Sequence, residues 1–201
     1  MLFQEFAALN LYWNEFIELF GSSEKRVERL NRAAPGFFRM VQDQQFESNM
    51  LHLARLTDSP KSVGRENLTI RNLPALVGDS ALKREFLALL DQVERKTQFC
   101  QDWRNRHFAH RDLMLATQQT SAMPLEAVTK EKFFAALRAV SDVLNAMERF
   151  YYRGGCSFED IAAHNGAGTL LHILGLGIEA RERTREQIAK GDFSAFLPQQ
   201  V

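Results

Sequence analysis

The sequence is poor in cysteine, and its formal charges cancel. Its two cysteines, Cys100 and Cys156, lack the paired spacing of a disulfide framework or a zinc site, which favours a reduced, cytoplasmic setting. Lys and Arg together number 25, as do Asp and Glu, so the whole chain exerts no net attraction on nucleic acid. Any contact with RNA must therefore come from a local basic patch.

Long apolar runs are also missing. The most apolar stretch, Gly166 to Ile178, covers about thirteen residues and contains His172, whereas a membrane-spanning helix needs about 20. The opening residues, MLFQEFAALN, include Glu5 and have no basic region of the kind found in a signal peptide. We therefore expect a soluble protein with no membrane partner.

The chain does contain strong helical periodicity. Apolar residues recur every three or four positions, which predicts helices over 2–20, 23–33, 36–55, 80–114, 130–152 and 167–190. We expect Asp79 or Ser80 to cap the fourth of these, a short helix near Ile70 to be broken by Pro74, and Gly154 to end the helix over 130–152. Residues 58–70 show no β pattern, so the predicted fold class is all-α.

At 201 residues, the chain is long enough for one domain that buries about 70% of its unfolded surface. We predict a helical domain over residues 1–153 and a C-terminal helical extension over 154–201. The helix over 167–190 is apolar on all sides through Ile178, so we expect it to be buried or covered by a partner. The extension would then pack on the same domain or on a second copy of the chain.

The densest group of reactive side chains is WRNRHFAHRD, from Trp103 to Asp112. Arginine supplies a permanent, forked cation that suits phosphate, and histidine can give or take a proton near neutral pH. The combination favours chemistry on a phosphodiester. The polar members of this segment are Arg104, Asn105, Arg106, His107, His110, Arg111 and Asp112.

The spacing within this segment predicts that one copy makes a poor compact site. On a continuous helix, Arg104 and His110 would be roughly 120° apart around the axis and about 9 Å apart along it. Either the helix bends within the segment, or a second subunit completes the site across a two-fold interface. We favour the second interpretation and expect a homodimer.

The pattern of Arg104, then Asn105, four further residues and His110 resembles the Arg-x4–6-His signature of the HEPN superfamily. Three other strings strengthen this resemblance and point to the branch of AbiU-type abortive-infection phage-defence proteins. They are FGSSEKRVERLNRAAPGFFRMVQ (20–42), LARLTD (53–58) and RENLTI (65–70). The resemblance covers about residues 10 to 150 and implies a HEPN-type helical bundle.

The resemblance implies a metal-independent endoribonuclease of phage defence or of a toxin–antitoxin system. His110 would exchange protons with the ribose and the leaving oxygen, Arg104 would hold the charge on the phosphate, and Asn105 would support them. Expected partners are RNA and a second subunit, with an antitoxin protein as a further candidate, and no cofactor is expected. The further RNA-binding residues would be Arg106, His107 and Arg111.

Other interpretations stay open. The same arginines would also suit a non-catalytic RNA-binding or nucleotide-binding dimer, a scaffolding HEPN module, or a purely structural dimer. A metal site at His107 and His110 would need more ligands than the neighbouring residues offer, so no metal is expected. We expect Asp112 to pair with an arginine, and His52, His164 and His172 to be satisfied, partly buried histidines.

Overall fold

The computed structural model describes residues 1–62, 64–109, 112–117 and 123–193. The chain forms two compact units, of which the first contains residues 1–14 and 44–162 and the second contains residues 15–43 together with residues from 163 onwards. Two long helices contribute residues to both units. The division of the chain into residues 1–153 and 154–201 stays a prediction.

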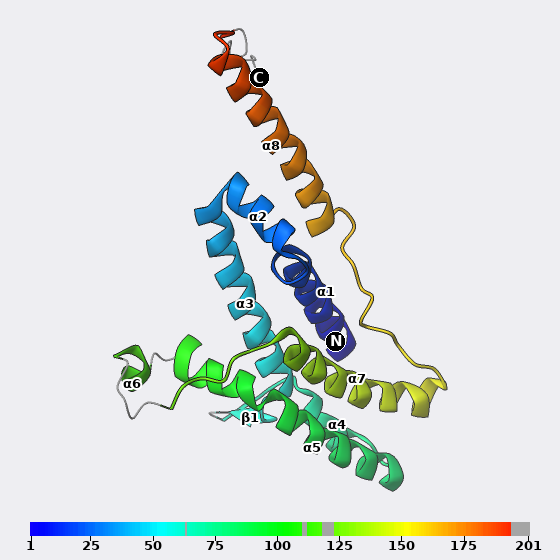
Figure 1. Ribbon diagram of the computed structural model, residues 1–201. Helices are drawn as coiled ribbons and strands as arrows, with labels where there is room; N and C mark the ends of the chain where they lie inside the picture. Colours follow the sequence, from blue (N-terminus) through cyan, green and yellow to red (C-terminus); the bar gives the residue numbers. More distant parts are fainter. Residues whose placement is uncertain (63, 110–111, 118–122, 194–201) are drawn as a thin grey trace. The chain divides into compact units, whose positions relative to one another are not determined.

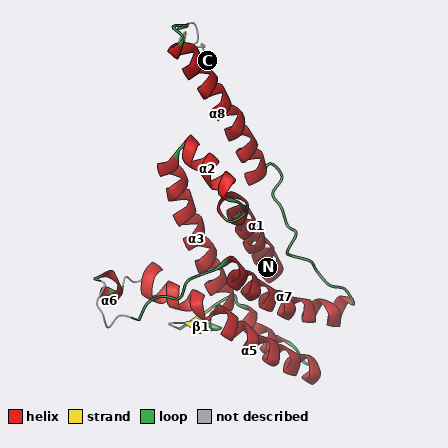
Figure 2. Ribbon diagram, in the orientation of Figure 1, coloured by secondary structure: helices red, strands yellow, loops and turns green. Residues whose placement is uncertain are grey.

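The described chain is almost entirely helical, which confirms the all-α fold class (Figures 1 and 2). Most helices begin and end within a few residues of the predicted bounds. The long helices are α1 (Leu2–Phe20), α2 (Glu24–Ala33), α3 (Pro35–Thr57), α5 (Ser80–Trp103), α7 (Lys130–Tyr152) and α8 (Ala167–Ala189).

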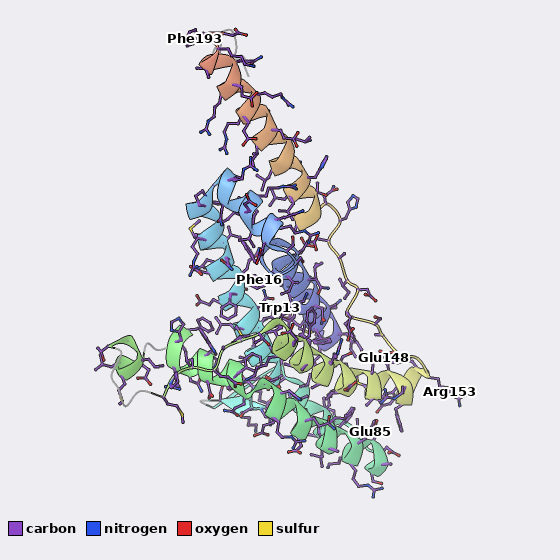
Figure 3. The ribbon with its side chains drawn as sticks, in the orientation of Figure 1. Trp13, Phe16, Glu85, Glu148, Arg153 and Phe193 are labelled. Atoms are coloured by element: carbon purple, nitrogen blue, oxygen red, sulfur yellow. The ribbon has the colours of Figure 1, made fainter. Side chains whose placement is uncertain are left out.

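The core of the first unit lies between α5 and α7, which pack side by side (Figure 1). Asp79 caps α5, as predicted, by accepting hydrogen bonds from the backbone N–H groups of two residues in its first turn. Buried aromatic rings join α1 to α7: Trp13, labelled in Figure 3, stacks on Phe133 with ring centroids 3.8 Å apart. Aromatic burial of this kind fixes the N-terminal part of α1 against the two long helices.

The connection between α3 and α5 differs from the prediction in two ways. Two-residue strands, β1 (Lys61–Ser62) and β2 (Arg65–Glu66), pair antiparallel where no β structure was expected. Gly64 has a φ of +77°, a conformation that glycine adopts easily and that allows this tight turn. Strands of this length contain too few residues to show an alternating hydrophobic pattern in the sequence.

The prediction that Pro74 breaks a helix was wrong. A 3₁₀ turn, η1 (Ile70–Asn72), leads into the short helix α4 (Leu73–Leu76), and Pro74 lies in the first turn of α4. Proline fits there because the first-turn N–H groups have no partner within the helix. The glycine prediction was also wrong: Arg153, with a φ of 55°, adopts the left-handed conformation that ends α7.

The second unit has its own small core, formed by Leu19, Leu30, Phe38, Ala167 and Leu171. A carboxylate oxygen of Glu15 accepts a hydrogen bond from the N–H of Ala167 at the start of α8. The apolar half of α8 is only partly covered within this structure, since Leu170, Ile173 and Leu176 are exposed. No helix in the described ranges is long and apolar enough to span a membrane.

Candidate functional site

The segment singled out in the sequence begins where α5 changes its winding. The predicted α-helix through Met114 is wrong, because α5 ends at Trp103 and Arg104–Phe108 form a π-helical turn, η2. In this turn the N–H of Ala109 donates to the carbonyl oxygen of Arg104 at 2.8 Å, five residues earlier. π-turns of this kind are frequent at functional sites.

Aromatic packing gives a physical reason for the wider turn. Trp103 and Phe108 are five residues apart, which on an α-helix would point them about 140° apart. In the π-turn their ring centroids are 5.6 Å apart, and both rings pack near Phe46 of α3, at 5.5 Å and 6.4 Å. Packing both rings against one neighbour therefore favours the extra residue in the turn.

Arg104 turns towards the end of α3. Its Nη1 donates to Oδ2 of Asp58 at 2.6 Å, and its Nε donates to Oδ1 of Asn105 at 3.0 Å. The Arg104 and Asp58 side chains are 29% and 26% exposed, so solvent screens this ion pair less than it screens a fully exposed pair. The contact joins residues 46 positions apart and fixes the direction of the guanidinium group.

Hydrogen bonds to backbone carbonyl groups hold the segment that contains Asp58 in place. The Thr69 hydroxyl is fully buried and lies 2.9 Å from the carbonyl oxygen of Leu56 and 2.8 Å from that of Asp58. Arg71 donates through Nε to the carbonyl oxygen of Thr57 at 2.8 Å. Arg104, Asp58 and Thr69, one residue from each of the strings RNRHFAHRD, LARLTD and RENLTI, therefore lie close together.

Arg104 and Asp58 line a pocket of about 690 Å³ in the first unit. The other walls come from α1 and α3, with apolar, aromatic and charged side chains in roughly equal share. We call this the Arg104 pocket. It is lined by Glu5, Ala8, Tyr12, Ser48, Leu51, His52, Arg55, Asp58 and Arg104.

A second charged group lies in the same pocket. Oε2 of Glu5 is 3.1 Å from Nε2 of His52 and 2.9 Å from Nη2 of Arg55. The His52 side chain is only 10% exposed, as expected for a satisfied, partly buried histidine. Burial and the nearby Arg55 charge lower the pKa of His52, and the Glu5 carboxylate only partly opposes them. Near pH 7, His52 is therefore a neutral imidazole.

Arg106 and His107 lie in a different place from Arg104. They line a second pocket, of about 300 Å³, which also includes Trp103 and Asp112. Arg106 donates through Nη2 to the carbonyl oxygen of Met123 at 2.5 Å, and its Nε lies 3.5 Å from Oδ2 of Asp112. The two arginines, which are two residues apart on one helical turn, therefore line separate pockets.

Asp112 pairs with an arginine, as predicted, and also starts a helix. Its Oδ1 accepts hydrogen bonds from the N–H groups of Met114 and Leu115, which caps the short helix α6 (Leu113–Ala116). The Leu115 N–H is the main cause of a lowered pKa at this carboxyl group, with smaller contributions from Met114 and Arg106. Asp112 is therefore an ionised capping residue.

His110 and Arg111, the remaining predicted site residues, lie outside the described residues. Sequence reasoning missed the other members of the Arg104 pocket. Glu5, Ala8 and Tyr12 recur at spacings of three and four residues, which places them on one face of α1, but nothing marked that face as functional. Among the described residues, no three His, Cys, Asp or Glu side chains are placed to hold a metal ion.

Residues 2–169 match a family model, the HEPN family AbiU2. The chain belongs to this family. The AbiU2 match runs from the start of α1 to the first residues of α8 and so covers more of the chain than the predicted 10–150. It contains every residue that lines the Arg104 pocket. Searches of curated proteins and of solved structures found no match to this AbiU2 protein.

Proposed function

We propose that this AbiU2 protein is a metal-independent endoribonuclease of phage defence or of a toxin–antitoxin system. The observation that carries the proposal is the Arg104–Asp58 contact at 2.6 Å beside a pocket of about 690 Å³. A guanidinium group held in a fixed direction is suited to binding the charge that develops on a phosphate during cleavage.

The proposed reaction needs one anchored cation and a group that moves protons. The 2′-hydroxyl loses its proton to a base, and the 2′-oxygen then forms a bond to phosphorus. The bond from phosphorus to the 5′-oxygen breaks, and an acid returns a proton to that oxygen. We assign the proton transfers to His110, on the basis of the HEPN motif, and the charge stabilisation to Arg104. Asn105 supports Arg104 through the 3.0 Å hydrogen bond to its Nε.

We also propose that the working form is a homodimer with the motif at its two-fold interface. Apolar side chains next to the motif support this proposal, since Leu113, Met114 and Met123 are 70%, 40% and 77% exposed. Exposed apolar surface of this kind is what a protein–protein interface would cover. Two copies would supply two His110 side chains, one for each proton transfer.

The test is cleavage of total bacterial RNA in EDTA by the purified full-length protein and by His110→Ala. We expect the wild type to release fragments with 2′,3′-cyclic phosphate ends and His110→Ala to lose at least about 100-fold in rate, because general acid–base catalysis typically contributes about 10²–10⁴-fold. His172→Ala, on α8, is the matched control and should cut RNA at the wild-type rate.

Three outcomes would contradict the catalytic proposal. The first is that neither protein cuts RNA although both bind it, and in that case the non-catalytic binding dimer replaces the nuclease. The second is that cleavage persists in His110→Ala. The third is that cleavage occurs only with added divalent metal, which would contradict the metal-independent mechanism.

A further inference from the structure

We infer that the Arg104 pocket binds a single ribonucleotide unit of the RNA, with the base stacked on Tyr12 and the phosphate bound by Arg104. The inference rests on the proposed function for its substrate class, but it concerns binding and not cleavage. The pocket volume of about 690 Å³ is within the range of small-molecule sites, which are commonly about 300–1,000 Å³.

Tyr12 supplies the stacking surface. Its side chain lines the pocket and yet is 53% exposed, so a large part of the residue remains uncovered by the protein. The ring of His52 lies nearby, with ring centroids 6.3 Å apart and planes at 48°. Exposed aromatic rings inside a polar groove are the usual platforms for the bases of single-stranded nucleic acid.

The pocket offers hydrogen-bond acceptors beside that ring. Oε2 of Glu5 is engaged by His52 and Arg55, whereas its Oε1 has no hydrogen-bond partner among the residues described in the structure. Carboxylates in nucleic-acid sites accept from exocyclic amino groups, such as that of cytosine. We therefore expect adenine, cytosine and guanine to bind better than uracil, which has no amino group.

Arg104 supplies the phosphate end. A guanidinium group has five N–H donors, and Asp58 and Asn105 engage its Nη1 and Nε. In the described part of the chain, Nη2 has no partner, so it remains free to donate to a phosphate oxygen. Asp58 fixes the guanidinium group without consuming all of its donors.

The two ends of the pocket have different partners. His52 of α3 lies beside the Tyr12 ring, with ring centroids 6.3 Å apart, and Asp58, just after α3, binds Arg104. His52 therefore marks the base end of the pocket and Asp58 the phosphate end. A nucleotide, with a flat base at one end and an anion at the other, matches this division better than inorganic phosphate or a purely apolar ligand.

The experiment measures binding of the four ribonucleoside 3′-monophosphates, the matching nucleosides and inorganic phosphate to the full-length protein by calorimetry. We expect adenosine, cytidine and guanosine 3′-monophosphates to bind more tightly than uridine 3′-monophosphate. All three should also bind more tightly than their nucleosides or phosphate alone. These ligands have no scissile bond, so binding is scored even if the protein cuts no RNA.

Variants at the ring test the base end. Tyr12→Leu should weaken nucleotide binding about 5- to 150-fold, as expected for loss of one stacked base, whereas Tyr12→Phe should bind like the wild type. Tyr151→Leu is the matched control, because Tyr151 is also 53% exposed but lies on α7 and does not line the pocket. Arg104→Gln should reduce nucleotide binding to the level of the nucleoside.

Two results of the binding experiment would overturn the inference: no nucleotide binding by the wild type, or equal affinity in Tyr12→Leu and Tyr151→Leu. Nucleotide binding that depends on Tyr12, together with an absence of RNA cleavage, would remove the nuclease proposal and leave the binding site standing. RNA cleavage by Tyr12→Leu with an unchanged KM would remove the proposed binding site and leave the nuclease proposal standing. Circular dichroism of each variant confirms that the helices are formed.

Discussion

Arg104 and Arg106 are two residues apart in sequence, yet the structure places them in different environments. Arg104 binds Asp58, a residue 46 positions away, beside a pocket of about 690 Å³. Arg106 binds Asp112 and the Met123 carbonyl, both within its own stretch of chain, beside a pocket of about 300 Å³. One arginine is fixed by the tertiary fold, and the other secures its own loop.

The difference shows that the basic side chains of one short motif do not all belong to the same site. Within the described residues, the predicted phosphate-binding group divides into Arg104, which faces the charged pocket, and Arg106, whose guanidinium is engaged with local acceptors. Side chains two residues apart on a helical turn point to roughly opposite sides, and the contacts of each guanidinium group hold it in its own pocket. Variants that treat the two arginines alike should therefore behave differently.

The largest expected effect separates the two arginines directly. Arg104→Gln should lower kcat/KM for RNA cleavage about 10²–10³-fold, because it removes a cation held against the developing charge. Arg106→Gln removes the same charge but should cause a clearly smaller loss in rate. Steady-state cleavage of a labelled RNA measures both, and equal losses would mean that the two pockets act as one site.

A smaller effect should come from the support behind Asp58. Thr69→Val removes a buried hydroxyl that is shared by two carbonyl oxygens, and it should cost about 1–3 kcal/mol in the free energy of unfolding. It should also reduce RNA cleavage, because Asp58 loses its fixed position. Chemical denaturation and cleavage assays on the same preparation measure the two effects.

Thr97→Val is the control for that change. Thr97 is also buried, but its hydroxyl donates to the Val93 carbonyl oxygen of its own helix, at 2.9 Å. We expect it to leave RNA cleavage unchanged. If Thr97→Val reduced cleavage as much as Thr69→Val, general loss of stability and not the position of Asp58 would explain the effect.

The smallest expected effect is a dependence of stability on pH. The pKa of His52 is lower in the folded protein than its usual value of 6.5, so the unfolded chain binds more protons at mildly acidic pH. The contribution of neutral His52 to the free energy of unfolding is therefore fully present above about pH 6.5. It declines as the pH falls from there towards the pKa of His52 in the folded protein. Denaturation midpoints between pH 5 and 8 should show this decline.

Two variants should change the size of this pH effect in opposite directions. His52→Gln removes the titrating group and should make stability less dependent on pH below about 6.5. Glu5→Gln removes the carboxylate that raises the pKa of His52, so the folded pKa should fall further and the acid-induced loss should grow. A pH dependence that is the same in both variants would show that His52 is not its source.

Much of the fold could be predicted from the sequence because helices depend on local rules. The apolar residues of α1, α5 and α7 recur every three or four positions, and the cap at Asp79 uses a side-chain oxygen next to the N–H groups that need it. The sequence also marked the strings LARLTD, RENLTI and RNRHFAHRD as related to one family, which the match over residues 2–169 confirms.

The wrong predictions concern segments in which a local sequence pattern is too short, or in which packing against a distant residue overrides it. The hairpin of β1 and β2 has two residues per strand and depends on Gly64, and the left-handed end of α7 is at Arg153 and not at a glycine. The end of α5 at Trp103 follows from the packing of Trp103 and Phe108 near Phe46, a residue more than 50 positions earlier. Periodicity within a helix contains no information about such a neighbour.

The sequence alone determined most of the helices, the cap at Asp79 and the motif of the family, because each depends on residues within a few positions of one another. Only the tertiary structure decided which motif residue faces which pocket, because that depends on contacts between distant segments. The Arg104–Asp58 pair, the Thr69 hydroxyl behind it and the Glu5–His52 contact join α1, α3, η1 and η2. No spacing rule in the sequence relates these residues to one another.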